Sequence, residues 1–267
     1  MRSLCNRAWT KRFMQLCCGL FLCSVVTFTA SAQGSAGSEG KIEPRYLIDI
    51  PTAGLLERGS FSFDVNFYQA GGVLLGLSAG PLDRLNFGIS YGGTSIIGTE
   101  TPRWNQLPGV NIKFRLFDES DLVPAIAIGF DSQGKETYID SLERYTIKSP
   151  GFYAAGSKNY AILGYLSIHG GINYSMERAD GDRDVNAFLG VEKTVGSDIS
   201  VMLEHDFGFN DSNREALGKG RGYLNFGARW SLGNGFTIGL DLKDIIRNQQ
   251  DITIGKRTIR LEYVRFW

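Results

Sequence analysis

Apolar and polar residues alternate with a period of two along most of this chain. In the stretch 109–117, GVNIKFRLF, alternate residues are apolar from Val110 to Leu116, and the residues between them include Lys113 and Arg115. The same alternation recurs most clearly in the segments 60–68, 84–91, 223–232 and 236–243. Helical periodicity is nearly absent. Because side chains of a β-strand point alternately to opposite faces, this period predicts strands whose two faces meet different surroundings.

The spacing of these segments predicts a barrel. About twelve strands fit between Ser60 and Trp267, or roughly 17 residues for each strand with its connection. Short connections at 81–84, 118–122, 196–198 and 233–235 alternate with longer polar connections at 93–108, 132–150, 177–184, 210–221 and 246–256. We therefore expect an all-β fold, a closed antiparallel transmembrane β-barrel of about 12 strands with short periplasmic turns and longer extracellular loops.

Alternation alone also fits a soluble β-sandwich, in which the apolar rows form the core. Three further features favour lipid. Aromatic residues gather near the predicted strand ends, as interfacial girdles do, and the polar row is rich in glycine and serine. The last strand, 257–267, ends on Trp267 and resembles the C-terminal strand by which the outer-membrane insertion machinery recognises barrels. A soluble periplasmic β-sandwich or lipocalin-like binding protein remains the alternative.

The first 32 residues predict export. Four basic residues precede the uncharged run 13–30, and the small residues Ala30 and Ala32 frame a signal-peptidase site. We expect a signal peptide over 1–32, cleaved near Ala32, an N-terminal linker or periplasmic segment over 33–59, and a β-barrel over 60–267. The expected location is the outer membrane of a Gram-negative-type bacterium, in contact with its lipid and lipopolysaccharide.

Composition narrows the functional classes. All four cysteines lie in the signal peptide, so the mature chain is expected to hold no disulfide and no thiolate metal site. Loss of four basic residues leaves 24 Lys+Arg against 28 Asp+Glu, a net charge of −4. Nucleic acid is therefore excluded as a partner, because binding phosphates requires a basic surplus. We expect no cofactor and no resident metal ion.

Charged residues on the polar row are candidates for the lumen of the barrel. They are Asp64, Lys113, Arg115, Asp131, Glu204, Asp206, Arg229, Asp241, Lys243, Arg260 and Glu262. Mixed signs on facing strands fit two interpretations, a salt-bridged filling of a narrow interior and the lining of a selective pore. A twelve-strand barrel is intermediate in bore between filled eight-strand barrels and open sixteen-strand porins.

Two other features invite chemistry. His169 lies on the polar row near Ser167 and Asn173, which suggests a lipid- or glycan-modifying outer-membrane enzyme as an alternative function. His205 falls on the apolar row and is expected at the membrane interface. The run DGDRD, 180–184, spaces carboxylates as calcium loops do, but it lacks the glycine and the late glutamate of such loops. A solvated loop is the simpler interpretation.

Four segments together resemble the YjbH-like outer-membrane β-barrel family: PTAGLLERGSF (51–61), LSAGPLDRLNFGISYGG (77–93), GVNIKFRLFDESDLVPAIAIGFDSQG (109–134) and YAAGSKNY (153–160). The resemblance implies an outer-membrane barrel associated with exopolysaccharide export. It also implies that Lys113, Arg115, Asp131 and Lys158 are lumen residues. The expectation is a non-enzymatic channel or accessory protein, with a polysaccharide as a possible further partner.

Overall fold

The computed structural model describes residues 43–213, 215–250 and 255–267, so the predicted signal peptide lies outside the described residues. No described helix is long and apolar enough to cross a membrane. The strands are β1 (Ser60–Tyr68), β2 (Gly72–Leu82), β3 (Leu85–Thr94), β4 (Arg103–Trp104), β5 (Gly109–Phe117), β6 (Ala125–Asp131), β7 (Lys135–Ile139), β8 (Arg144–Ile147), β9 (Gly151–Ala161), β10 (Tyr165–Tyr174), β11 (Asn186–Thr194), β12 (Ile199–Asp206), β13 (Tyr223–Gly233), β14 (Phe236–Lys243) and β15 (Lys256–Phe266).

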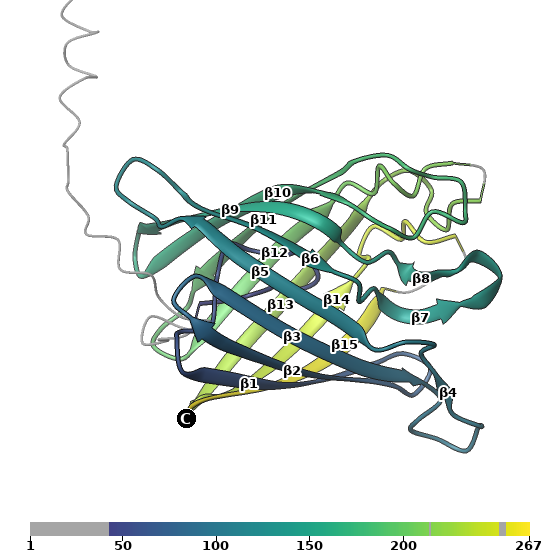
Figure 1. Cartoon of the computed structure of the whole chain (residues 1–267), viewed down its shortest axis with the longest axis horizontal. Coiled ribbons are helices and arrows are strands. Elements are labelled where there is room, and N and C mark those ends of the chain that lie inside the picture. The colour runs from purple at the N-terminus through teal and green to yellow at the C-terminus, as the bar shows by residue number, and fades with distance from the viewer. Residues whose placement is uncertain (1–42, 214, 251–254) are drawn as a thin grey trace, which may run out of the picture.

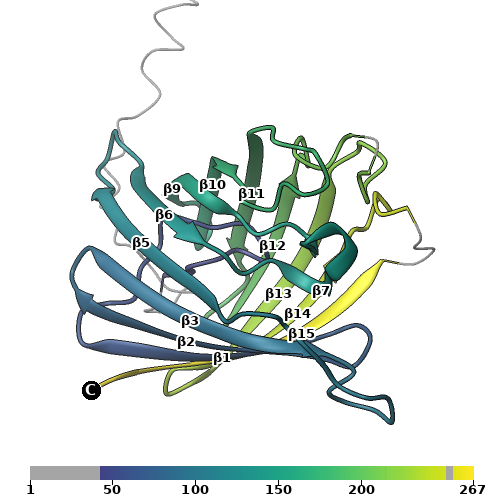
Figure 2. The same cartoon turned by 45° about the vertical axis from the view of Figure 1, so that its right-hand side comes forward.

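Twelve of these strands close into a barrel (Figures 1 and 2). Each strand pairs antiparallel with its neighbours, and β1 closes the ring by pairing with both β2 and β15, with Ser60 opposite Phe266. Short β4 extends β3 alone, and β7 pairs with β8 in a separate two-stranded sheet. Closure leaves no exposed sheet edge, as a hydrocarbon environment requires. The predicted barrel of about 12 strands is confirmed.

The connections follow the predicted alternation. Tight turns join β2 to β3, β11 to β12 and β13 to β14 at the end of the barrel where the C-terminus lies, and the long connections cluster at the opposite end (Figure 1). One connection departs from the rule. The turn between β1 and β2 is short but belongs to the long-loop end, and it bends through positive φ at Ala70 (57°) and Gly71 (61°).

The two faces of the barrel wall have opposite chemistry. Outward side chains are apolar and exposed: Ile112 is 49% exposed and Leu240 is 59% exposed. Inward side chains are buried: Lys113 is 2% exposed and Glu204 is 1% exposed. A soluble sandwich would show the reverse, with the aliphatic row sealed in a core. The structure therefore contradicts that alternative. The apolar band on a closed barrel is the surface of a protein of the outer membrane.

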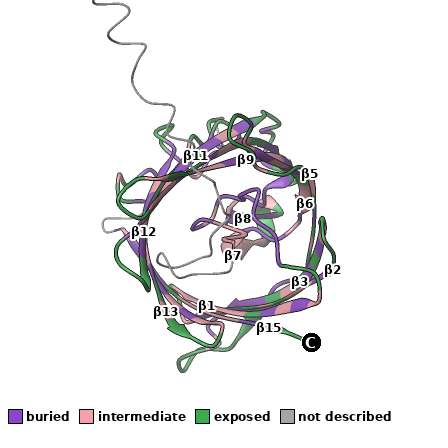
Figure 3. Cartoon of the chain, turned by 90° about the vertical axis from the view of Figure 1, so that its left-hand side faces the viewer, coloured by how far each residue is buried: buried purple, intermediate pink, exposed green. Residues whose placement is uncertain are grey.

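Residues 43–56 enter the barrel as a hairpin, which we call the lumen hairpin. Its two arms meet at a bridge between Tyr46 and Pro51, and a tight turn brings Leu47 N–H to Ile50 C=O at 3.0 Å. Figure 3 looks along the barrel and shows buried chain inside the ring of strands. Sequence patterns assign this stretch to a linker or periplasmic segment. The structure instead makes its described part the filling of the lumen.

The hairpin formed by β7 and β8, which we call the loop hairpin, turns in from the opposite end and lies within the outline of the ring (Figure 3). Glu136 of β7 forms an ion pair with Lys256 of β15, and Gln133 accepts a hydrogen bond from Ser90 of β3 at 3.0 Å. The Nζ of Lys135 lies 5.0 Å from the ring centre of Tyr46. The loop hairpin and the lumen hairpin thus meet inside the barrel.

The lipid-facing row should tolerate charge only near its ends. We expect Leu240→Arg, in the middle of β14, to destabilise the barrel by about 2–4 kcal/mol, because the guanidinium would sit at the centre of the bilayer. Leu232→Arg, near the turn that ends β13, should cost only about 0–1 kcal/mol. Reversible urea unfolding in phospholipid vesicles measures both. Equal costs at the two positions would contradict the assignment of the lipid face.

Candidate functional site

Two predicted lumen cations of β5 hold the backbone of the lumen hairpin. The Lys113 ammonium donates to three backbone carbonyls of the hairpin at 2.7, 3.0 and 3.2 Å. Arg115 donates from Nε and Nη2 to the carbonyl of Ala53 at 3.1 and 2.8 Å, and it forms an ion pair with Glu43. The Arg45 carbonyl also accepts from Thr52 N–H across the hairpin at 3.2 Å, and none of these carbonyls bonds to the backbone of a barrel strand in the described residues, so side chains of the wall bind them.

Glu204 of β12 binds backbone N–H groups of the hairpin. Its carboxylate accepts hydrogen bonds from the consecutive N–H groups of Ile48 at 2.8 Å, Asp49 at 2.9 Å and Ile50 at 3.2 Å. Asn225 of β13 donates to the same carboxylate at 2.8 Å. Successive N–H groups that converge on one point form an anion-binding nest, and here the anion belongs to the barrel wall.

Ion pairs fix the charged side chains of the hairpin to the wall. Arg45 lies 2.9 Å from Asp64 of β1 and 2.9 Å from Glu262 of β15. Asp49 at the hairpin tip pairs with Lys243 of β14 at 2.6 Å. All five side chains are at most 16% exposed, so removing one partner would leave its counterpart buried and uncompensated.

Two wall arginines also reach the tip. Arg229 of β13 forms an ion pair with Asp241 of β14 and donates to the carbonyl of Leu47 at 3.2 Å. Arg260 of β15 donates to the carbonyl of Ile48 at 2.6 Å and carries no ion pair within the described residues. Cations from four strands of the wall therefore converge on one short peptide.

The apolar side chains of the hairpin tip, Leu47, Ile48 and Ile50, pack against a matching region of the wall. A Cβ placed on Gly190 of β11 would lie 2.3 Å from Leu47, and one placed on Gly227 of β13 would lie 3.1 Å from Ile48, so these glycines make room for the tip. The buried cluster around the tip comprises Leu47, Ile48, Ile50, Tyr153, Ala155, Phe188 and Met202. An apolar patch inside a polar barrel thus marks the place where the hairpin docks.

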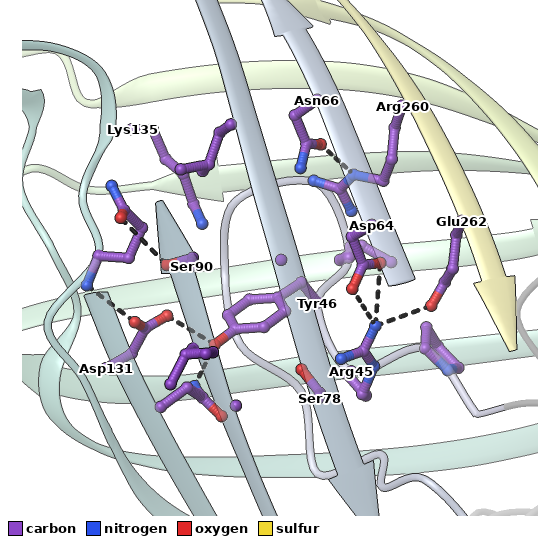
Figure 4. A pocket seen from close by; sticks show the side chains of 18 of the residues that line it. Arg45, Tyr46, Asp64, Asn66, Ser78, Ser90, Asp131, Lys135, Arg260 and Glu262 are labelled. Carbon is purple, nitrogen blue, oxygen red and sulfur yellow. Dashed lines mark hydrogen bonds and ion pairs between the residues drawn. The ribbon is translucent and has the colours of Figure 1, made fainter. Parts of the chain in front are cut away.

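A polar cavity of about 100 Å³ remains between the lumen hairpin and the loop before β7 (Figure 4). The Tyr46 hydroxyl projects into the wall there, donating to Asp131 at 2.6 Å and contacting Asn111. A smaller cavity of about 30 Å³ shares Lys135 and Arg260 with it. Volumes of this size hold a few water molecules or a small ion.

The predicted lumen residues divide into two groups. Eleven lie on the inward row: Asp64, Lys113, Arg115, Asp131, Glu204, Asp206, Arg229, Asp241, Lys243, Arg260 and Glu262. Lys158 is the exception, because it shares the outward row of β9 with Phe152 and Tyr160. Near the strand end its long side chain reaches back to the short turn after β5, where Nζ lies 3.3 Å from Glu119.

His169 has a serine neighbour, but not the one that sequence proximity suggests. Its Nδ1 lies 2.8 Å from the hydroxyl of Ser157 on β9, and that hydroxyl also accepts from Ala53 N–H at 2.9 Å. Ser167 and Asn173 bond elsewhere. Hydrolase triads orient the histidine through a third group, and His169 Nε2 is buried without a partner in the described residues. The geometry therefore gives the enzyme alternative no support.

The long loops carry a separate buried network. Arg144 pairs with Asp180 and Asp211 at 2.7 Å each, and Lys148 pairs with Asp180 at 2.7 Å. Tyr223 donates to Asp211 at 2.6 Å. Among the described residues no group of three histidine, cysteine or carboxylate side chains is placed to hold a metal ion. Asp180 thus joins its own loop to the loop 132–150, and Arg144 extends the network to Asp211 in a third loop. The expectation of a solvated loop is wrong for the run 180–184, because Asp180 and Asp182 are buried.

Removing the Glu204 carboxylate should loosen the lumen hairpin. In Glu204→Ala three neighbouring N–H groups would lose their acceptor, at a cost of about 1–3 kcal/mol for each buried donor left unpaired. We expect trypsin to cleave after Arg45, which is protected by burial and two ion pairs in the intact protein. Mass spectrometry would detect the new N-terminus at Tyr46.

Glu192→Ala provides the matched control. It removes another buried carboxylate of the inward row, one that bonds the strand wall and not the hairpin in the part of the chain that the structure describes. This variant should stay resistant at Arg45. Equal cleavage in the two variants would mean that general loosening of the barrel, and not the carboxylate nest, controls the hairpin.

Comparisons with known proteins return folds alone. No protein-family model matches the sequence, and no curated protein does. The solved structure of the KdgM porin has a TM-score of 0.48 at 10% identity, covering 76% of this chain and 98% of that one. The NanC porin has a TM-score of 0.43 at 10% identity, covering 78% and 99%. The translocator domain of the autotransporter NalP from Neisseria meningitidis has a TM-score of 0.38 at 12% identity, covering 78% and 86%.

Proposed function

We propose that the protein is a non-enzymatic outer-membrane channel whose lumen is held closed by its own N-terminal hairpin. One observation carries the proposal. In the described residues, every hydrogen bond between the lumen hairpin and the wall involves a side chain, and none joins hairpin backbone to strand backbone. The ring of strands is complete without the hairpin. The filling is therefore a separate body that the barrel binds, not a part of its sheet.

Withdrawal of the hairpin would leave a wall suited to water. The inward row holds charged and amide side chains on most strands, such as Asn86, Lys113 and Glu204, so a vacated lumen would be polar. Water could then replace the backbone groups that these side chains now bind. A barrel of this strand number is wider than the eight-strand barrels that side chains alone can fill.

The path of withdrawal follows from the ends of the hairpin. Glu43 pairs with Arg115 and Leu56 N–H donates to Asn86, and both contacts lie at the short-turn end of the barrel. The hairpin therefore enters from and returns to the same, periplasmic side. Opening would be a retreat toward the periplasm that leaves the extracellular loops in place.

Exopolysaccharide export, which the family resemblance implies, forms the finer part of the proposal. A polymer chain could not share the lumen with the hairpin, because the space beside the tip is only about 100 Å³. Any such role therefore requires hairpin displacement first. A polymer that arrives from the periplasm would meet the hairpin at the mouth through which the hairpin enters the barrel.

Replacing the tip of the hairpin tests the proposal. We expect a variant in which residues 45–52 are exchanged for a Gly/Ser linker of equal length to conduct ions in planar bilayers. The intact protein should stay near the closed level, since its lumen is occupied. Heat-modifiable migration on a gel would establish that the variant barrel is folded. A folded variant with no conductance above that of lipid alone would leave the barrel a purely structural role.

Ion selectivity locates the conducting path. In the open variant, Lys113→Glu should shift the preference toward cations, because it reverses a charge on the inward row. Lys158→Glu makes the same change on the outward row and should leave selectivity unchanged. An equal shift for both substitutions would place the current outside the lumen.

A further inference from the structure

Lys135, the first residue of β7, is an unpaired cation in the barrel interior. Its ammonium makes no ion pair and no hydrogen bond with the described residues, and it lies over the ring of Tyr46, 5.0 Å from the ring centre. Burial lowers the pKa of Lys135 below its ordinary value. The other cations that contact the hairpin are satisfied by carboxylates or by backbone carbonyls. Lys135 therefore has unused donor capacity.

Arg260 lines the same space and is only partly used. Its Nε donates to Asn66 at 2.8 Å and its Nη2 to Ile48 C=O at 2.6 Å, which leaves Nη1 without a partner in the part of the chain that the structure describes. Figure 4 shows Lys135 and Arg260 directed into one space, with Asn66 beside the guanidinium. Both cations line the cavity of about 100 Å³ and the adjoining one of about 30 Å³.

The acids near this space are already engaged. Asp131 accepts from the Tyr46 hydroxyl at 2.6 Å and from Gln133 N–H at 2.9 Å, and it lies beyond ion-pair distance of Lys135. Asp49 pairs with Lys243. Asp64 and Glu262 both pair with Arg45. Three of these carboxylates, Asp64, Asp131 and Glu262, also line the cavity, but the lining holds four cations, Arg45, Lys135, Arg229 and Arg260, and so carries one more positive than negative charge. Among these cations, Lys135 makes no ion pair or hydrogen bond with the described residues, and Arg260 makes no ion pair with them.

We infer that this cavity is a binding site for a small oxyanion, a carboxylate or a phosphate group, held between Lys135 and Arg260. Two cations that present N–H donors from opposite elements are the chemistry by which proteins bind such groups. The volume fits a single carboxylate or phosphate with a few waters. The site also joins the loop hairpin, through Lys135, to the tip of the lumen hairpin, whose Ile48 carbonyl Arg260 holds.

Titration calorimetry of the full chain in detergent micelles tests the inference. Inorganic phosphate and acetate are titrated separately in chloride buffer, and we expect saturable one-site binding of at least one of them. The probe that binds identifies the group. Lys135→Met should weaken that binding about tenfold or more, the effect of losing a charge-assisted hydrogen bond. Lys135→Arg, which keeps the charge, should retain binding within a few-fold.

Lys219→Met is the matched control. It makes the same charge change in a long loop, where the ammonium bonds, among the described residues, only the carbonyls of Arg247 and Gln249, and it should leave the affinity unchanged. Absence of saturable binding by both probes would overturn the inference. So would equal affinity in Lys135→Met and the intact protein, or equal loss in Lys219→Met. The measurement involves no current, so its outcome is independent of whether the barrel conducts.

Discussion

The structure depends on one constraint, that a peptide without a sheet partner must have its backbone satisfied inside a closed barrel. Lys113 donates hydrogen bonds to hairpin carbonyls, and Glu204 accepts hydrogen bonds from consecutive hairpin N–H groups. Cations meet C=O and an anion meets N–H, so each wall charge has the sign that its target requires. The charged inward row thus has a specific occupant, and it is neither a random filling nor a bare pore lining.

Much of this architecture could be predicted from the sequence. A period of two in a closed barrel exposes alternate residues to lipid and lumen, so the pattern around Val110 and Lys113 reveals both faces without further information. The inward position of the eleven charged candidates follows from it. The outward position of Lys158 does not follow from it, because alanine and glycine occur on both faces of β9. Only residues such as Tyr153 and Ser157 indicate which face of that strand is inward.

The lumen hairpin could not be predicted in the same way. Residues 43–56 hold no run of alternation, Pro44 and Pro51 interrupt the chain, and the tip 47–50 holds only three apolar residues. Its stabilising contacts are remote in sequence, such as the 156 residues between Ile48 and Glu204. A signal did exist in the glycines of the inward row. Gly190 and Gly227 leave space for a tip that only the folded chain supplies.

The short tether defines how such a hairpin can act. Only residues 57–59 separate it from β1, and three residues span at most about 10 Å, so a displaced hairpin stays beside the periplasmic mouth. A binding segment on so short a linker has an effective concentration on the order of millimolar or above. Any solute that occupies the lumen must compete with that concentration. In the proposed gating, the closed state therefore requires no exceptional affinity between hairpin and wall, and opening requires several contacts to be lost together, such as those that Glu204 and Lys113 make with the hairpin backbone.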